Sequence, residues 1–289
     1  MTRDRPWTQG RRERTTPGAA PGRPGARFQE GALDRPRGPL PTRVSDLPEL
    51  PEAYRDALAA GLEALDLRID AEARAAIDGH VRLLLAWTTA INLTGIREPA
   101  AVALNHVVHS LAVVPLLRAR GITALLDLGS GGGFPGLTIA AALPADRVLL
   151  VDSVAKKVGF LATVIEATGL GRTVAAEAVR AEALAHDDRD REAWPAVTSR
   201  AVAALAELVE VGLPLVAPGG ILVAWKRLPL DEELAAAGPA LEALRAGRLE
   251  VVDPAVPGLE AHRLIVVERA GPIDLRYPRD PGERRQRPL

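Results

Sequence analysis

The stretch from Leu125 to Gly136 most constrains the fold, because an apolar segment runs directly into a cluster of glycines. Between Gly129 and Gly136, five of the eight residues are glycine and one is serine. Glycine costs conformational entropy, so a chain concentrates it where the backbone turns sharply or lies against a ligand. Pro135 suits the first position of a helix. The stretch therefore predicts a buried strand, a glycine loop and a helix.

After residue 122 the pattern alternates between short apolar runs and longer amphipathic segments. We predict strands at 124–128, 147–151, 172–175, 196–199 and 221–225, separated by helices at 135–143, 154–168, 178–185 and 203–215. A helix at 231–245 then precedes two strands, 248–253 and 262–268, joined as a hairpin. Such alternation gives right-handed crossovers and a parallel sheet with helices on both faces. The predicted class is α/β, with a Rossmann-like sheet that ends in an antiparallel hairpin.

The rest of the chain divides by composition. Residues 1–45 are rich in Arg, Pro and Gly and predict a disordered arm. Residues 46–121 show apolar residues at spacings of three and four and predict an all-helical extension. Residues 122–270 hold the alternating elements, and 271–289 form a polar, basic tail. We therefore predict an arm, a helical extension, an α/β domain and a tail.

Composition excludes several classes of protein. The chain has no cysteine, which rules out disulfides and thiolate metal ligands. We find no uninterrupted run of eighteen apolar residues and expect no membrane span. The arginine-containing start has no apolar core of a secretory signal. These features predict a cytoplasmic protein.

Charge is unevenly distributed. Residues 1–43 carry ten arginines and four acids, whereas the whole chain has a net charge of −1, so the remainder is acidic. A basic arm on an acidic body suggests a polyanionic partner, although solvated arms with no partner are also common.

The glycine loop fits two binding patterns. Gly131-x-Gly133-x-x-Gly136 matches a dinucleotide fingerprint, and Asp127-x-Gly129-x-Gly131-x-Gly133 matches the adenosylmethionine loop of class I methyltransferases. A pyrophosphate requires a bare helix N-terminus, whereas a cationic cofactor favours the nearby carboxylate of Asp127. Asp152, at the end of the next strand, could hold the ribose hydroxyls of either cofactor. Both cofactors stay open at this point, with adenosylmethionine favoured.

The amino-acid sequences of several motifs, taken together, resemble those of one family, the RsmG (GidB) family. These motifs are, in order, Trp87 to Thr94, His106 with Ser110, Asp127 to Gly136, Asp152 to Leu161, Ser199-Arg200-Ala201, Gly219-Gly220 followed by Lys226, Tyr277-Pro278-Arg279 and Pro288-Leu289. The resemblance runs from about residue 48 to 289. Two positions depart from it, since His109 stands where the family has Asp and Arg227 where it tends to have Gly.

The resemblance implies a bacterial class I methyltransferase that uses S-adenosylmethionine to form 7-methylguanosine in 16S ribosomal RNA of the small subunit. It also implies an RNA partner, and we expect no membrane partner and a monomer. The N7 atom of guanine is already a nucleophile, so no strong base is needed and catalysis is mainly positioning. The target base must be unpaired or extruded.

We assign residues to roles on this basis. The cofactor-binding candidates are Asp127, Gly129, Ser130, Gly131, Gly133, Phe134, Asp152, Arg180, Ala181, Glu182 and Arg200. The catalytic candidates are Arg200, Lys226 and His106. Arg200 suits phosphate or a purine edge because its guanidinium can donate two parallel hydrogen bonds. His106 and His109 share a helix face, but no acid lies close on it and we expect no metal. His80 is interpreted as a core residue.

Three other functions remain as alternatives. A methyltransferase for a small molecule or protein would show no salt-sensitive affinity for RNA. An NAD(P)-dependent oxidoreductase would bind NAD(H) and not adenosylmethionine. A non-enzymatic nucleic-acid-binding protein with a relic Rossmann core would depend on its basic arm.

Overall fold

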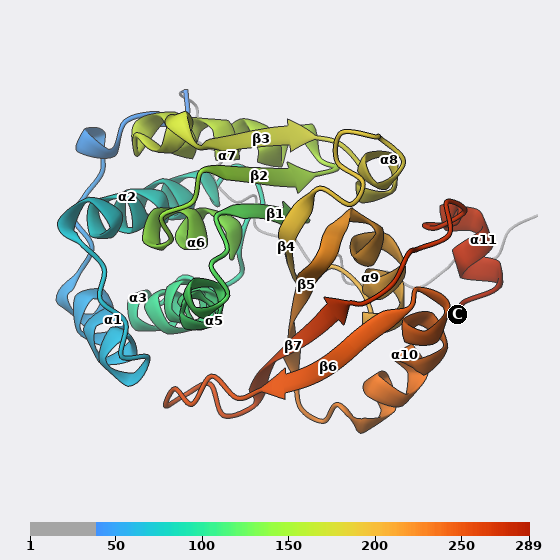
Figure 1. Cartoon of the computed structure of the whole chain (residues 1–289). Coiled ribbons are helices and arrows are strands. Elements are labelled where there is room, and N and C mark those ends of the chain that lie inside the picture. Colours follow the sequence, from blue (N-terminus) through green and yellow to red (C-terminus); the bar gives the residue numbers. More distant parts are fainter. Residues whose placement is uncertain (1–38) are drawn as a thin grey trace, which may run out of the picture. The chain divides into compact units, whose positions relative to one another are not determined.

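Seven strands form one sheet in the computed structural model, which describes residues 39–289 (Figure 1). The order across the sheet is β3-β2-β1-β4-β5-β7-β6. The strands are β1 (Ala124–Leu128), β2 (Arg147–Asp152), β3 (Val174–Ala178), β4 (Trp194–Arg200), β5 (Val216–Arg227), β6 (Ala246–Val252) and β7 (His262–Arg269). Strands β1 to β5 pair in parallel, and β7 is antiparallel to both β5 and β6. The predicted parallel sheet with an antiparallel hairpin is confirmed.

The strand order reverses between β1 and β4. From β1 the chain builds outward through β2 and β3, and then returns to place β4 on the other side of β1. Loops that leave the carboxyl ends of these two strands diverge, which opens a crevice where ligands bind in sheets of this kind. The glycine loop follows β1 at this switch point, and Arg200 ends β4 there.

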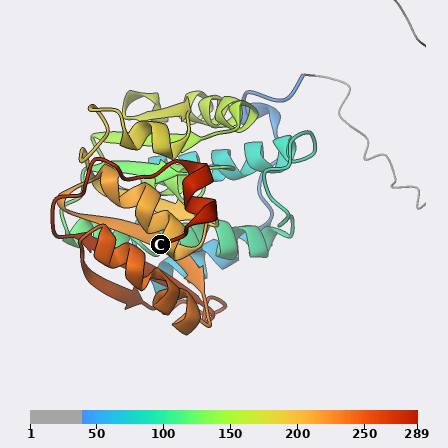
Figure 2. The ribbon, with the colours of Figure 1, turned by 90° about the vertical axis from the view of Figure 1, so that its right-hand side faces the viewer.

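Helices cover both faces of the sheet (Figures 1 and 2). The chain begins its described part with η1 (Val44–Asp46), α1 (Glu52–Ala64), α2 (Ala71–Trp87), α3 (Pro99–Val102), the π-helical turn η2 (Ala103–Val108), α4 (His109–Leu111) and α5 (Val114–Ala119). The later helices are α6 (Gly136–Ala142), α7 (Ala155–Ala167), η3 (Leu170–Arg172), α8 (Ala181–Ala185), α9 (Leu205–Gly212), η4 (Leu213–Leu215), α10 (Asp231–Ala243) and α11 (Pro281–Gln286).

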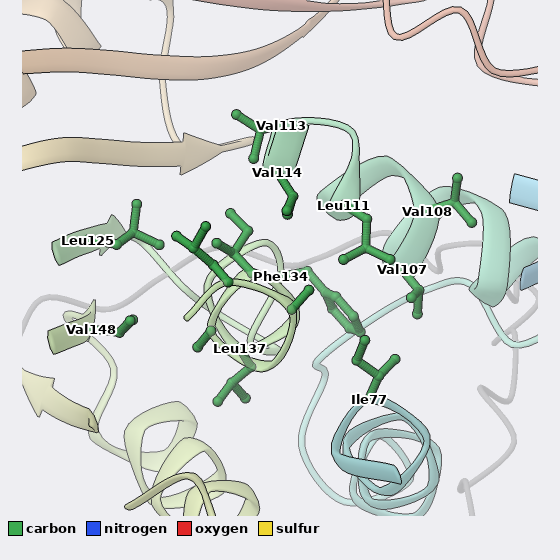
Figure 3. Packing of buried hydrophobic residues seen from close by; sticks show 14 of the residues in the cluster. Ile77, Val107, Val108, Leu111, Val113, Val114, Leu125, Phe134, Leu137 and Val148 are labelled. Atoms are coloured by element: carbon green, nitrogen blue, oxygen red, sulfur yellow. The ribbon is translucent and has the colours of Figure 1, made fainter. Parts of the chain in front are cut away.

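The two faces of the sheet carry two separate apolar cores. Because side chains alternate along a strand, Leu125 of β1 packs into one core and Leu126 into the other. The first core joins the sheet to α6 and α7 and also to the N-terminal helices. Figure 3 shows Ile77 of α2 and Val107 of η2 gathered with Leu137 and Phe134 in this core. The helical extension is thus continuous with the sheet's own core.

Element boundaries differ from prediction in two informative places. β5 begins at Val216, so Pro218-Gly219-Gly220 lies inside the strand and not in a turn before it. The β4–β5 register shifts between Trp194 and Ala196, and this irregularity accommodates the extra residues. Pro135 is the N-cap of α6 and not its first helical residue.

Contacts to the rest of the protein hold both ends of the described part of the chain, residues 39–289. Residues 1–38 of the predicted arm lie outside the described residues, but Pro41 accepts a hydrogen bond of 2.7 Å from the indole of Trp87. At the other end, Tyr277 is buried and the predicted tail ends in α11, which lies beside α9 in Figure 2.

Among residues 39–289, the segment Pro99–Ala119 is the one helical stretch long and apolar enough, by length and composition, to cross a membrane. The sequence shows no uninterrupted apolar run there, because Asn105, His106 and His109 interrupt the segment. In the structure 56% of its most apolar window is buried inside the protein. Packing in the first core accounts for its composition.

Candidate active site

Two adjacent cavities lie beyond the carboxyl ends of the strands. The first, of about 350 Å³, is lined by residues from the ends of β1, β2, β3 and β4. The second, of about 670 Å³, lies between the glycine loop, the end of β4 and the segment that precedes α3. Gly129, Lys157 and Ala201 line both cavities. A ligand could therefore occupy the first cavity and present a group to the second across Gly129.

The first cavity brings together the residues predicted to hold a nucleoside. Asp152 ends β2, and Arg180, Ala181 and Glu182 begin α8 after β3. The Asp152 carboxylate accepts hydrogen bonds from the backbone N–H of Gly131 (3.0 Å) and of Val154 (2.9 Å). A carboxylate offers about four acceptor sites, so Asp152 keeps capacity for ribose hydroxyls while it fixes the loop.

The glycines of the loop serve two different purposes. Gly129 has φ of +70° and lines both cavities, so it lets a ligand pass close to the backbone. Gly133 has φ of +88° but lines neither cavity. A Cβ at Gly133 would lie 2.5 Å from Leu137 and 2.7 Å from the His80 ring, so glycine there is required by packing within the protein.

Asp127 lies where the sequence did not predict it. Its side chain is fully buried behind the loop and lines neither cavity. One oxygen accepts a hydrogen bond from the Thr198 hydroxyl (2.7 Å) and the other from the Gly136 N–H at the start of α6 (3.2 Å). Burial raises its pKa to about 6, against the opposing effect of these hydrogen bonds. The carboxyl group ties β1 to β4 and α6 and faces neither cavity, and its predicted role near the cofactor stays a prediction.

This placement predicts the behaviour of Asp127→Asn. An amide can donate to Thr198 and accept from Gly136, so cofactor affinity should stay within about threefold of wild type, less than the loss of one hydrogen bond to a charged group. The pKa of Asp127 is higher in the folded chain than in the unfolded one, so its protonated form favours folding. As the pH rises from 4 to 6, the unfolding free energy of the wild type should thus decrease relative to that of the variant, by up to about 3 kcal/mol. Urea melts at both pH values measure this, and a strong loss of cofactor binding by the variant would contradict it.

The second cavity is organised around Arg200. Its guanidinium donates to the Asn105 carbonyl (3.2 Å), the His106 Nδ1 atom (3.3 Å) and, more weakly, the Ser110 hydroxyl (3.5 Å). Within residues 39–289 no carboxylate lies within 4.0 Å of it. Burial lowers the pKa of Arg200 to about 10, so the group stays charged at neutral pH. The cavity thus contains a partly buried positive charge whose direct hydrogen-bond partners are neutral, with the Asp127 carboxylate acting on it from farther away, and such a charge favours an anionic ligand.

His106 is a neutral imidazole with a defined tautomer. Because Nδ1 accepts from Arg200, the proton is on Nε2, which donates to the Thr94 hydroxyl (2.6 Å). Burial, together with the positive charge of Arg200, lowers the His106 pKa to about 3. The network orients Arg200 from the side of the helical extension and gives His106 no protonated form near neutral pH.

Phe134 joins the loop to the helical extension by stacking. The rings of His80 and His106 stack on it, with centroids 4.3 Å and 4.8 Å away. His80 is buried, as expected for a core residue, but it also donates from Nε2 to the Gly132 carbonyl (2.7 Å). Sequence reasoning missed this contact because His80 is 52 residues from Gly132. A polar side chain on the apolar face of α2 was the one available signal.

Lys226 is held by the protein and not free in the cavity. Its ammonium donates to Glu233 (2.5 Å) and to the Ala203 carbonyl (2.7 Å). The same Glu233 oxygen accepts a hydrogen bond from the Leu205 N–H (2.8 Å), so the Lys226–Glu233 ion pair fixes the loop between β4 and α9. Lys226 lines the second cavity, and its predicted catalytic role stays a prediction.

The two departures from the family motifs also lie at this cavity. His109 and His262 meet edge to face, with ring centroids 4.4 Å apart, and Arg227 lies on the adjoining wall. Arg284, which the sequence did not single out, lines the first cavity from the far end of the chain.

Comparison with known proteins agrees with this site. A family model described as rRNA small subunit methyltransferase G (GidB) matches residues 74–255. The Ribosomal RNA small subunit methyltransferase G of Anaeromyxobacter dehalogenans (strain 2CP-1 / ATCC BAA-258) is 40% identical over 204 residues, which cover 70% of this chain and 91% of the relative. The protein of that name from Sorangium cellulosum is 39% identical over 218 residues, 75% of this chain and 88% of the relative.

One solved structure, an O-methyltransferase from Bacillus cereus in complex with SAH, covers 75% of this chain and 100% of its own, with 14% identity and a TM-score of 0.48. The family assignment depends on the sequence matches, and the family model covers the residues that line both cavities except Arg284 and His262. The chain belongs to the rRNA small subunit methyltransferase G (GidB) family, whose members are adenosylmethionine-dependent methyltransferases.

Proposed function

We propose that this chain transfers a methyl group from S-adenosylmethionine to the N7 atom of a guanine in 16S ribosomal RNA, within the small ribosomal subunit. The observation that carries the proposal is the pair of cavities that meet at Gly129 and Ala201. The first cavity has the residues to bind a nucleoside, and the second has the partly buried guanidinium of Arg200 to bind an anionic group of the substrate. The name shared by the relatives supports ribosomal RNA as the substrate.

The residues of the first cavity fit an adenosyl group. Asp152 would accept from the ribose hydroxyls, and the backbone of Arg180, Ala181 and Glu182 would flank the adenine. The bound cofactor supplies a methyl group attached to a positively charged sulfur. Gly129, Ser130, Gly131 and Phe134 line the second cavity, where the methyl-bearing end would lie.

The residues of the second cavity suit a reaction without a general base. The lone pair of guanine N7 attacks the methyl carbon directly, so the protein needs to align the two atoms. His106 is neutral and already donates to Thr94, which is consistent with a positioning role. Arg200 would hold a phosphate or the guanine O6 atom. Lys157 and Arg227 on the same walls add positive charge for RNA.

The direct test is incorporation of labelled methyl from S-adenosylmethionine into small subunits purified from a strain that lacks the modification. We expect label at the N7 of one guanosine after the RNA is digested and mapped. Subunits from the modified parent strain serve as the control and should take up none. Folded protein that binds the cofactor and gives no incorporation would refute the proposal.

Two further measurements separate the remaining possibilities. Comparing naked 16S RNA with assembled subunits tells which of them is the substrate, and we expect the particle. Titration with NAD(H) tests for an oxidoreductase, which would bind it tightly without binding adenosylmethionine. We also expect the protein to be cytoplasmic and to be a monomer. Analytical ultracentrifugation measures the oligomeric state.

A further inference from the structure

The last residues of the chain are anchored to α9 by a buried ion pair. Arg279 donates from Nε and Nη2 to the two carboxylate oxygens of Glu210, at 2.8 Å and 2.7 Å. The Glu210 side chain is only 3% exposed, and the Arg279 N–H also donates to it. Bidentate pairs of this kind fix both distance and orientation. The segment from Arg279 onward therefore has a defined position on the protein.

From this anchor, α11 carries Arg284 to the wall of the first cavity. Arg284 is 8% exposed and donates to the Arg279 carbonyl (2.8 Å). Its Nη2 atom meets Glu182 at the start of α8 (2.5 Å) and Glu207 on α9 (3.5 Å). All three side chains line the cavity of about 350 Å³. One guanidinium therefore links the segment predicted to flank the adenine with a helix on the opposite wall.

The charges explain what Arg284 does there. Glu182 and Glu207 both approach the same guanidinium nitrogen, so without that group two carboxylates would face each other across the cavity edge. Like charges at such separation repel, and burial strengthens the repulsion. α8 has five residues, and Leu184 and Ala185 near its end are buried in the second core, whereas Glu182 in its first turn is held by the ion pair with Arg284.

We propose that Arg284 is a positioning residue for the cofactor, and that the C-terminal segment from Arg279 to Leu289 completes the adenosyl-binding wall by holding Glu182. The inference rests on the proposed function, since it takes the first cavity as the adenosyl site. Arg284 acts on affinity for the cofactor and leaves the reacting atoms in the second cavity undisturbed.

The test is calorimetric titration of the full chain with S-adenosylhomocysteine. Arg284→Ala should weaken binding by about tenfold, within the range of coupling between sites. In steady-state methylation it should raise KM for adenosylmethionine and leave kcat and the KM for small subunits near wild type. Arg285→Ala, an exposed neighbour on α11, is the matched control and should bind normally.

Two more variants separate positioning from a general loss of structure. Arg284→Lys keeps the charge and should recover part of the affinity. Adding Glu207→Gln to Arg284→Ala removes the repulsion and should also restore binding, which a merely unfolded protein would not do. Wild-type affinity in Arg284→Ala, or no rescue by either change, would overturn the inference. A wild-type chain that fails to bind the cofactor would instead refute the proposed function.

Discussion

Replacing Arg200 by alanine should lower the rate of methyl transfer by roughly a hundredfold to a thousandfold, the effect seen when an aligned charged donor is removed from a site. The guanidinium is positioned by the Asn105 carbonyl, His106 and Ser110, and no carboxylate of the described residues forms a direct ion pair with it. Its charge is thus available to an anionic group of the substrate. Single-turnover methylation of unmodified small subunits, with labelled adenosylmethionine in excess, measures the loss.

The same variant should not be less stable than wild type. A desolvated charge without a direct ion-pair partner costs free energy on folding, so its removal should leave the melting temperature unchanged or raise it. Affinity for S-adenosylhomocysteine should change less than turnover. Arg200→Lys keeps the charge without the planar fork and should recover only part of the rate. If Arg200→Ala transferred the methyl group at the wild-type rate, Arg200 would have no role in the reaction.

Asp152→Ala should weaken cofactor binding by about a hundredfold, because it removes two or more hydrogen bonds to a charged acceptor. The loss has two sources. Asp152 would hold the ribose, and it also fixes the glycine loop through the Gly131 N–H and the start of α7 through the Val154 N–H. Asp152→Asn keeps one carbonyl oxygen, so its affinity for the cofactor should lie between those of the wild type and Asp152→Ala. Calorimetric titration with S-adenosylhomocysteine measures each affinity.

The matched control is Asp146→Ala, an exposed acid just before the amino end of the same strand, far along β2 from the cavity. It should bind the cofactor as wild type does. If Asp152→Ala bound normally while Arg200→Ala lost the cofactor, the assigned roles of the two residues would have to be exchanged.

The fold was predictable because its signals are local. Apolar runs separated by amphipathic stretches fixed the order of strands and helices, and the strand–helix alternation then required parallel pairing. Since parallel strands end at one edge, Asp152 and Arg180 had to come near the glycine loop, and the structure places both in the first cavity. Their roles in binding stay predictions.

The other parts of the site depend on contacts between distant residues. Asp127 was expected to face the cofactor, but Thr198, 71 residues away, turns its carboxyl group inward. His80 reaches Gly132 only because α2 packs on the sheet, and Arg284 reaches Glu182 across 102 residues. No local sequence pattern indicates that residues so far apart in the chain come into contact. A buried polar residue on an apolar face and an arginine-rich end were weak signals for them.

The N-terminal helices share one apolar core with the sheet, and they also supply Thr94, His106 and His109 to the substrate cavity. Such a segment is not a separable module, because cutting near residue 121 would expose the part of the first core that the N-terminal helices cover.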